Sequence, residues 1–254
     1  NLKIGKKFME HPHYKTGDII ANYPEIYDVL DTGPDLSTKK ITVGPTAAMM
    51  KRENIGNAGI RLKIKKVSEI KKFTRMKQAI KEIVCISPSF GKKLLQLANK
   101  RQACWVQVQM AWEQKPSDEN SVELDFDNKD DHGVPRVKVK MKFNQKDKET
   151  AKIIMEKLGK SFIKKDIGRI GMLKYLDSEN TKFPEELLFF KGGHHMGGTQ
   201  MSNSEFNGVV DTNLKVFNTD NVWVAGSSTF TTGGHANPTL SIVQLSLRLA
   251  DHLS

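Results

Sequence analysis

The 254-residue sequence has only two cysteines, Cys85 and Cys104, and aromatic residues make up only 7% of it. Two cysteines are too few for a disulfide framework or a cysteine metal site, so we expect both to be reduced core residues. No stretch approaches the roughly 18 unbroken apolar residues of a membrane-spanning helix. The sequence therefore predicts a soluble protein without a membrane span.

Acidic residues are also fewer than basic ones, and the formal net charge is +11. This balance makes a polyanion partner worth weighing. The densest basic segment, residues 61–81, has apolar residues at three- and four-residue spacing and predicts an amphipathic helix with lysines on its solvated face. Aromatic residues, which single-strand binders use as stacking platforms, are sparse among these lysines. We expect no nucleic-acid partner, and a polyanion-binding domain is the last-ranked interpretation.

The first residue is Asn1, and neither a methionine nor a targeting leader precedes it. We expect that a further segment lies upstream and that it carries any targeting signal. The sequence therefore makes no prediction about localisation.

The middle of the chain carries clear periodic patterns. Residues 104–114 read as a strand, and Thr46 to Glu53 as a short helix. Residues 121–127 and 136–143 alternate apolar and polar side chains and predict a hairpin in an antiparallel sheet that is packed on one side only. Residues 146–164 predict an amphipathic helix.

The last quarter of the chain has a different character. Residues 221–228, "NVWVAGSS", contain an apolar run that predicts a strand covered on both faces, in an α/β layer. Residues 239–253 predict a mostly buried helix, with Asn237 as its N-cap and Pro238 at the first helical position. Such a helix start favours an anion or an electron-rich ligand, and the glycines in "GGHANPTLS", residues 233–241, permit close approach to the backbone.

A glycine-rich loop holds two adjacent histidines, His194 and His195. No carboxylate–histidine spacing typical of a zinc site accompanies them, so we expect no metal. Taken together with the two segments above, the loop resembles part of a known family. "HMGGT" (195–199), "GVVDTNLKVF" (208–217), "NVWVAGSS" and "GGHANPTLS" occur in the order and spacing of the C-terminal half of the glucose-methanol-choline (GMC) family of flavin-dependent oxidoreductases.

Two upstream segments extend this resemblance. Residues 121–143 are similar to the hairpin of the family's substrate domain, and "IGKKFMEHP" (4–12) is similar to the segment that leaves its flavin domain. The resemblance implies an α+β and α/β fold: a substrate-binding domain, residues 14–187, with an antiparallel sheet and flanking helices, and two segments of a Rossmann-like FAD domain, residues 1–13 and 188–254. The last segment would carry that domain's C-terminal strand and helix.

The family's GxGxxG dinucleotide fingerprint is absent from this sequence. The resemblance therefore implies FAD as cofactor together with an N-terminal FAD-binding half, on the same gene or on a separate chain. It also implies a small alcohol or sugar as substrate. The resemblance leaves the identity of the electron acceptor undecided between oxygen, a quinone and a haem protein.

The resemblance also implies roles for single residues. His195 matches the proton-accepting base, a task that suits an imidazole, and Asn237 matches the second active-site position, which hydrogen-bonds the substrate oxygen. His194 has a supporting role, and His235 is not assigned to the catalytic pair. The residues expected beside the flavin are Ala225, Gly226, Ala236, Asn237, Pro238 and Thr239.

Two interpretations remain. The first is an FAD-dependent alcohol dehydrogenase or oxidase, with a pattern closer to the sugar- and polyol-oxidising branches than to the choline or hydroxynitrile branches. The second is a non-catalytic subunit or interaction module that keeps the fold without the cofactor. The presence of His195, Gly226 and Asn237 favours the first, because a purely structural domain does not need all three.

Overall fold

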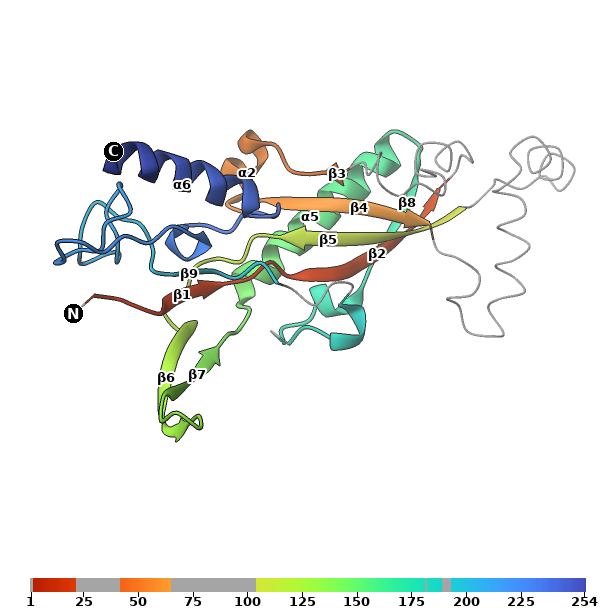
Figure 1. The fold of residues 1–254 in the computed structure, drawn as a ribbon. Helices are drawn as coiled ribbons and strands as arrows, with labels where there is room; N and C mark the ends of the chain where they lie inside the picture. The colour runs from red at the N-terminus through yellow and green to blue at the C-terminus, as the bar shows by residue number, and fades with distance from the viewer. Residues whose placement is uncertain (1, 22–41, 65–103, 181, 189–192) are drawn as a thin grey trace, which may run out of the picture. The chain divides into compact units, whose positions relative to one another are not determined.

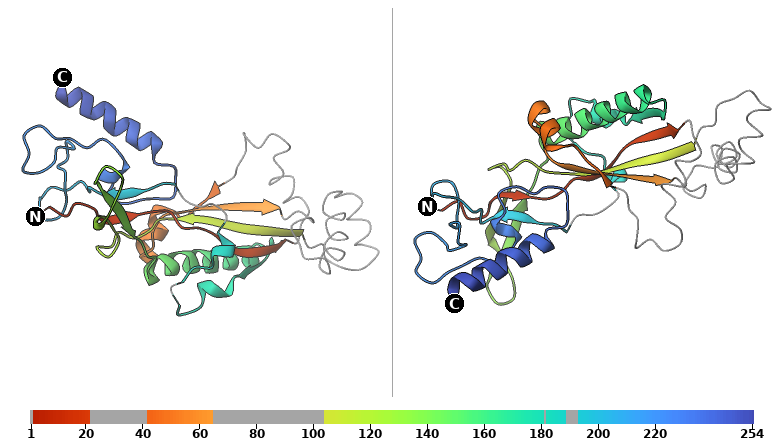
Figure 2. Two further views of the ribbon diagram at one scale, coloured as in Figure 1. Left: turned by 60° about the horizontal axis from the view of Figure 1, so that its bottom comes forward. Right: turned by 90° about the horizontal axis from the view of Figure 1, so that it is seen from above.

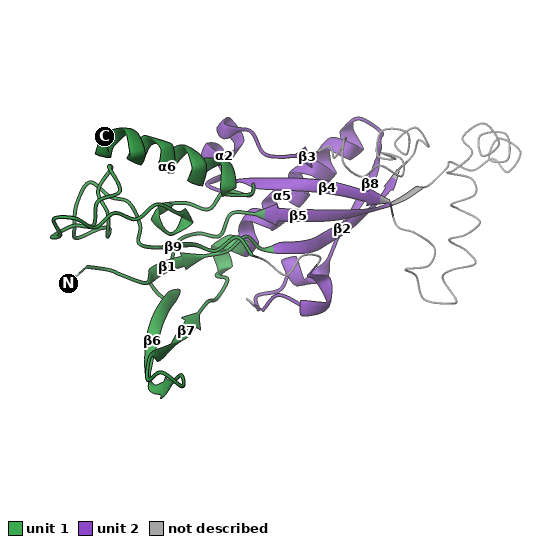
Figure 3. Cartoon of the chain, in the orientation of Figure 1, with its two compact units in different colours: residues 1–12, 112–147, 191–254 green, residues 13–111, 148–190 purple. Residues whose placement is uncertain are grey.

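The computed structural model describes residues 2–21, 42–64, 104–180, 182–188 and 193–254, whose helices and strands are labelled in Figure 1. The chain divides into two compact units, shown in different colours in Figure 3. Unit 1 consists of residues 1–12, 112–147 and 191–254, and unit 2 of residues 13–111 and 148–190. Each unit contains an antiparallel sheet, which confirms the predicted sheet type.

The sheet of unit 1 has four strands in the order β7-β6-β1-β9. Their bounds are β1 Lys6–Met9, β6 Ser121–Lys129, β7 Pro135–Lys140 and β9 Met196–Gly198. The pairs β1–β6, β1–β9 and β6–β7 are all antiparallel. A strand from the start of the chain therefore lies between strands from its middle and its end.

Strands β6 and β7 form the predicted hairpin, with Val122 opposite Val139 and Leu124 opposite Val137. One face of this hairpin is apolar, but it is not covered: Leu124, Phe126 and Val137 are 56%, 68% and 62% exposed. The expectation of a sheet packed on one side is therefore wrong for this hairpin, because no described segment of the chain covers its apolar face.

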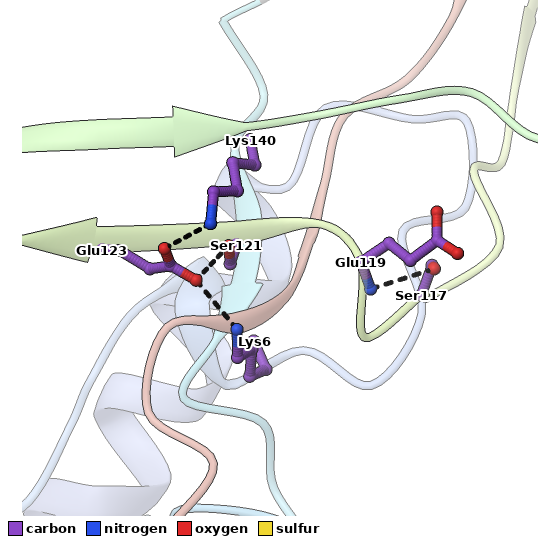
Figure 4. Close-up of polar contacts among 6 residues, drawn as sticks. All are labelled: Lys6, Ser117, Glu119, Ser121, Glu123 and Lys140. Atoms are coloured by element: carbon purple, nitrogen blue, oxygen red, sulfur yellow. Dashed lines mark hydrogen bonds and ion pairs between the residues drawn. The ribbon is translucent and has the colours of Figure 1, made fainter.

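The opposite face of the hairpin carries an ion-pair cluster, shown in Figure 4. Glu123 accepts hydrogen bonds from Lys140 Nζ at 2.7 Å and from Lys6 Nζ and Ser121 Oγ at 2.8 Å. The bond from Lys140, followed by those from Lys6 and Ser121, lowers the pKa of the Glu123 carboxyl to about 2. The same view shows the backbone N–H of Glu119 donating to Ser117 Oγ in the preceding turn.

Helix α6, Thr239–Leu253, has the predicted bounds but a different environment. Leu245 and Leu249 pack against a small core formed by Val209, Val210 and Leu214. No residue of α6 is buried, so the expectation of a mostly buried helix is wrong. This core is too small to cover the helix's broad apolar face, on which Leu240 and Leu247 are 69% and 62% exposed.

The start of α6 also differs from the prediction. Pro238, not Asn237, occupies the N-cap position, and no side chain caps the helix. The Pro238 carbonyl accepts from Ile242 N–H, which is the first hydrogen bond of the helix and makes Pro238 the residue before the first helical position. The cap expected at Asn237 is therefore wrong, and the amides of the first turn lack a side-chain partner.

Residues 221–228 do not form the predicted strand. Trp223 makes a single bridge with Lys215, and Ser227–Thr229 form the 3-10 helix η4. Val222 is 45% exposed, so the run is not covered on both faces. A strand requires a neighbouring strand along its length, and the described residues supply only that one bridge.

The sheet of unit 2 has five strands in the order β3-β4-β5-β2-β8. Their bounds are β2 His13–Ala21, β3 Thr42–Val43, β4 Ala58–Ile64, β5 Cys104–Trp112 and β8 Gly168–Met172. Strand β5 confirms the strand predicted for residues 104–114. Its side chains Val106, Val108 and Met110 are fully buried on one face, as their alternation predicts.

Helix α5, Gln145–Lys164, lies along one face of this sheet in both views of Figure 2. The packing is close: Thr16 Oγ1 lies 3.3 Å from Met155 Sδ. Helix α2, Ala47–Glu53, is capped by Thr46, whose hydroxyl accepts from Met49 N–H. Both helices were predicted. The 3-10 helices η2, Lys174–Leu176, and η3, Glu185–Leu187, complete the described elements of the unit.

The helix predicted over residues 61–81 is wrong at its start, because Arg61 to Ile64 belong to β4. There the alternation of apolar and polar side chains matches a strand that pairs with β3. Residues 65–81 and Cys85 lie outside the described residues. Among the helices that the structure describes, none combines the length and apolar character of a membrane span.

Candidate functional site

Three segments of unit 1 meet around the predicted histidines. The first is the end of β1 with the residues that follow it, the second is the His194–His195 segment that leads into β9, and the third is the glycine-rich segment before α6. Hydrogen bonds join the first segment to both of the others. The unit therefore brings together residues that are more than 180 positions apart in sequence.

Glu10 is the buried carboxylate at the centre of this arrangement, with its side chain only 8% exposed. Its Oε1 accepts from His194 N–H at 3.1 Å, and its Oε2 accepts from Gly193 N–H at 3.3 Å and lies 3.1 Å from His195 Nε2. Its own N–H donates to Gln114 Oε1 at 2.9 Å. A buried carboxylate is stable only when such donors replace water, so Glu10 holds the His194–His195 segment in place.

His195 has its side chain 66% exposed and paired with Glu10. Its ring lies beside that of Phe8, with centroids 5.4 Å apart, and its carbonyl accepts from Ser227 Oγ at 2.7 Å. An ionised carboxylate can only accept, so the pairing places the imidazole hydrogen on Nε2. The neutral ring then carries its lone pair on Nδ1, where it is able to accept a proton.

His11 lies on the other side of the same chain segment and is 2% exposed. Its Nδ1 lies 2.8 Å from the carbonyl oxygen of Gly234, and its ring meets that of His194 edge to face with centroids 5.2 Å apart. The pKa of His11 is lowered, chiefly because burial disfavours the charged form; the contact with the Gly234 carbonyl acts in the opposite direction. His11 therefore joins the glycine-rich segment to the His194 ring.

The glycines of the site divide into closely packed and open positions. A Cβ on Gly233 would lie 3.1 Å from Met196 Cε, whereas a Cβ on Gly226 or Gly234 would meet no heavy atom within 4 Å. Gly234 has a φ of +59°, a conformation that favours glycine. The Thr199 hydroxyl is buried and has no hydrogen-bond partner among the residues that the structure describes. The space beside Gly226 and Gly234 is therefore open, and the Thr199 hydroxyl is available for a polar ligand.

The predicted flavin-side residues lie in the two segments that carry Gly226 and Gly234. Gly226 directly precedes Ser227, which bonds the His195 carbonyl, and Ala225 is exposed. Ala236, Asn237 and Thr239 are exposed and Pro238 is partly exposed; all four follow the segment that His11 holds. The structure thus joins the segments that carry His195, Gly226 and Asn237 through Ser227, Glu10 and His11.

The sequence analysis missed Glu10 and His11. Both lie in "IGKKFMEHP", which was interpreted only as similar to the segment that leaves the flavin domain of the family. The available signal was two titratable residues placed directly after the apolar end of a strand, Phe8 and Met9. Such residues must find polar partners if that strand end is buried, as it is here.

Comparison with known proteins identifies the family. A family model described as GMC oxidoreductase matches residues 116–246, slightly more than half of the chain. The chain belongs to the GMC oxidoreductase family. One relative is 2-methyl-1,2-propanediol dehydrogenase of Mycolicibacterium austroafricanum, 28% identical over 165 residues, which cover 65% of this chain and 28% of the relative.

A second relative in the GMC family is the fructose dehydrogenase large subunit of Gluconobacter japonicus. It is 30% identical over 161 residues, which cover 63% of this chain and 27% of that protein. The matched segments thus span little more than a quarter of either relative.

Among solved structures, a formate oxidase resembles the chain with a TM-score of 0.45 at 15% identity, covering 98% of this chain and 47% of that one. An FAD-dependent oxidoreductase from Chaetomium thermophilum gives a TM-score of 0.44 at 12% identity, with 99% and 48% covered. No functional conclusion rests on these two likenesses.

Proposed function

We propose that this chain is the C-terminal part of an FAD-dependent enzyme that oxidises an alcohol group, with a sugar or polyol as the preferred class of substrate. Its membership of the GMC oxidoreductase family supports the reaction class. Two relatives, a diol dehydrogenase and a fructose dehydrogenase subunit by name, support the substrate class. The observation that carries the chemistry is the pairing of Glu10 with His195, the first residue of the segment "HMGGT".

The residues proposed to hold FAD are Ala225, Gly226 and the segment from Ala236 to Thr239. Three features support this: the open space at Gly226 and Gly234, the buried Thr199 hydroxyl and the amides of the first turn of α6, which no side chain caps. Those amides form the positive end of the helix dipole and favour a group that becomes negatively charged. When bound, FAD would supply the acceptor for the hydride that leaves the alcohol carbon.

His195 is proposed as the base. Its Nδ1 lone pair would accept the proton of the substrate hydroxyl, and the Glu10 carboxylate at Nε2 would stabilise the resulting imidazolium. Asn237 is proposed to hydrogen-bond the substrate oxygen and hold the carbon in line for hydride loss. Oxidation is then balanced, because the alcohol loses one proton to His195 and one hydride to the flavin.

The chain is proposed to act with an N-terminal FAD-binding half. The exposed apolar face of α6 and the single-bridged run at residues 221–228 are expected to complete a Rossmann-like domain with that half, which accounts for their lack of cover here. In this proposal residues 1–13 and 188–254 belong to the FAD domain and residues 14–187 to the substrate domain. An electron-acceptor partner is proposed as well.

The test is to produce the chain together with the coding sequence immediately upstream and to measure flavin absorbance before and after adding sugars and polyols. We expect a yellow protein that a sugar bleaches. In His195→Ala we expect the flavin to be retained and its rate of reduction to fall by roughly 10²- to 10⁴-fold. A colourless complex would instead support a non-catalytic interaction module.

His132→Ala is the matched control, because His132 lies in the exposed turn between β6 and β7 and should not alter reduction. His194→Asn tests the assignment within the adjacent pair. We expect a smaller loss than in His195→Ala, and the reverse order would move the base to His194. Full reduction rates in both variants would contradict a histidine base in this segment.

A further inference from the structure

Glu10 and His11 are consecutive residues whose side chains contact two different segments of the chain. Both are buried, at 6% and 2% exposure, and both are polar. Glu10 reaches the segment that carries the two histidines, while His11 reaches the segment that leads to Asn237. We call the two segments that they hold, residues 193–195 and residues 234–237, the two walls of the site. A single peptide bond therefore links the two residues that hold these walls.

The Glu10 anchor consists of three donors on one carboxylate. Two are backbone amides, Gly193 N–H and His194 N–H, and the third is the His195 ring. Bonds to two successive amides fix the backbone direction, and the bond to Nε2 fixes the ring that follows. This anchor determines where the imidazole of His195 lies.

The His11 anchor includes a hydrogen bond to the Gly234 carbonyl, a weaker backbone contact to Ala236 and the ring contact with His194. A neutral imidazole has one N–H, and the 2.8 Å contact to the Gly234 carbonyl places it on Nδ1. Burial favours that neutral form, because it lowers the pKa of His11. The Gly234 carbonyl lies three residues before Asn237, and a φ of +59° at Gly234 turns the chain there. This anchor determines where the segment before α6 begins.

We propose that the Glu10–His11 dipeptide is the positioning element of the site, which sets the separation between the His195 ring and Asn237 by holding one wall with each side chain. Neither residue is proposed to touch substrate or to exchange a proton with it. The effect on catalysis rests on the function proposed above, whereas the effect on the two walls does not.

Three variants of His11 separate its hydrogen bonding from its ring contact. Asn places an amide nitrogen close to the position of Nδ1 but has no ring; Phe has a ring but no donor; Ala has neither. By amide hydrogen exchange in the full chain, we expect Phe and Ala to speed exchange over residues 234–237 by roughly ten-fold or more and Asn to restore most of the protection. His132→Asn should leave exchange over residues 234–237 unchanged.

Two variants of Glu10 test the other wall. Glu10→Gln keeps one acceptor oxygen, and Glu10→Met keeps the length of the side chain without an acceptor. We expect exchange at Gly193 and His194 to rise by roughly ten-fold or more in Met and by less in Gln, with residues 234–237 affected less. Glu119→Gln, at an exposed carboxylate of the same unit, is the control.

In the flavin-loaded enzyme, misplacement of either wall should lower kcat by roughly 10- to 100-fold with KM nearly unchanged, because orientation of the reacting groups is lost while substrate binding remains. His11→Asn should recover most of kcat. A purely structural role would change the unfolding midpoint without this split between kcat and KM.

The two kinds of readout separate the two proposals. If exchange changes as expected but no variant alters an alcohol oxidation, the dipeptide positions the segments and the proposed function is wrong. If His11→Phe and Glu10→Met both keep the exchange and the kcat of the unaltered protein, the positioning role itself is overturned. If both variants fail to fold, the comparison of His11→Asn with His11→Ala and of Glu10→Gln with the unaltered protein decides.

Discussion

Unit 1 contains a second buried carboxylate, Asp147, that binds backbone amides as Glu10 does. Its Oδ1 accepts from Lys115 N–H and its Oδ2 from Asn144 N–H, both at 2.8 Å, and Asn144 Oδ1 accepts from Asp147 N–H in return. This reciprocal pair caps the start of α5. Burial raises the pKa of Asp147 to about 6, although its two amide bonds favour the charged form.

The difference between the two carboxylates lies in what else they contact. Both replace water by binding two amides, but only Glu10 also binds the ring of an exposed histidine. Asp147 fixes backbone and nothing more, so its removal should affect stability alone. Glu10 fixes backbone and orients a titratable group, which is the property expected of a site residue.

The largest expected effect concerns Asp147→Ala, which removes the acceptor of two backbone amides and the buried carboxylate that holds them. We expect a loss of about 3 kcal/mol in the free energy of unfolding, measured by urea denaturation. Asp118→Ala, at an exposed aspartate of the same unit, should change it by less than about 0.5 kcal/mol. Equal losses of unfolding free energy in both variants would contradict the structural role given to Asp147.

The next effect concerns glycines on the two sides of the Glu10 site. A Cβ on Gly197, whose φ is +75°, would lie 2.1 Å from the Lys7 carbonyl oxygen, so Gly197→Ala should cost about 2 kcal/mol or more. Gly226→Ala meets no atom within 4 Å and should cost less than about 0.5 kcal/mol.

The same Gly226→Ala variant should nevertheless weaken flavin retention in the complex with the N-terminal half, because its methyl group enters the open space beside Gly226 that the flavin is proposed to occupy. Stability comes from thermal unfolding of the chain, and retention from the ratio of flavin to protein absorbance. Unchanged retention would argue against a cofactor at Gly226.

The last effect concerns the dependence of stability on pH. The folded-state pKa of Asp147, about 6, lies above the ordinary carboxyl value, so the folded state binds more protons between about pH 4 and pH 6 and stability falls as pH rises through this window. The loss should approach about 2 kcal/mol. Urea midpoints measured from pH 4 to pH 7 should show this slope in the unaltered chain and a flatter one in Asp147→Asn. If Asp147→Asn shows the same slope as the unaltered chain, the pH dependence comes from another titratable group.

Local patterns predicted the elements well. The bounds of α2, α5, α6 and the β6–β7 hairpin follow from periodicity, and the buried face of β5 follows from its alternation. The motif "HMGGT" led to the family, which the match over residues 116–246 confirms. These features depend on neighbours in sequence, which a single sequence displays.

Long-range features were not predictable in the same way. The partner of Glu10 at His194 is 184 residues away, and the partner of His11 at Gly234 is 223 residues away. The apolar patterns of α6 and of residues 221–228 indicate where cover is needed, but not whether this chain supplies it. Pro238, not Asn237, is the N-cap because its carbonyl accepts the first hydrogen bond of the helix, a choice that composition alone leaves open.

The position of β1 between β6 and β9 has a consequence for the order in which the sheet of unit 1 folds. Because β1 comes before both of its partners in sequence, its two edges are paired only when residues 121–129 and residues 196–198 have joined it, and much of unit 2 lies between β1 and these partners in sequence. Removal of residues 6–9 would therefore take away an inner strand and separate β6 from β9.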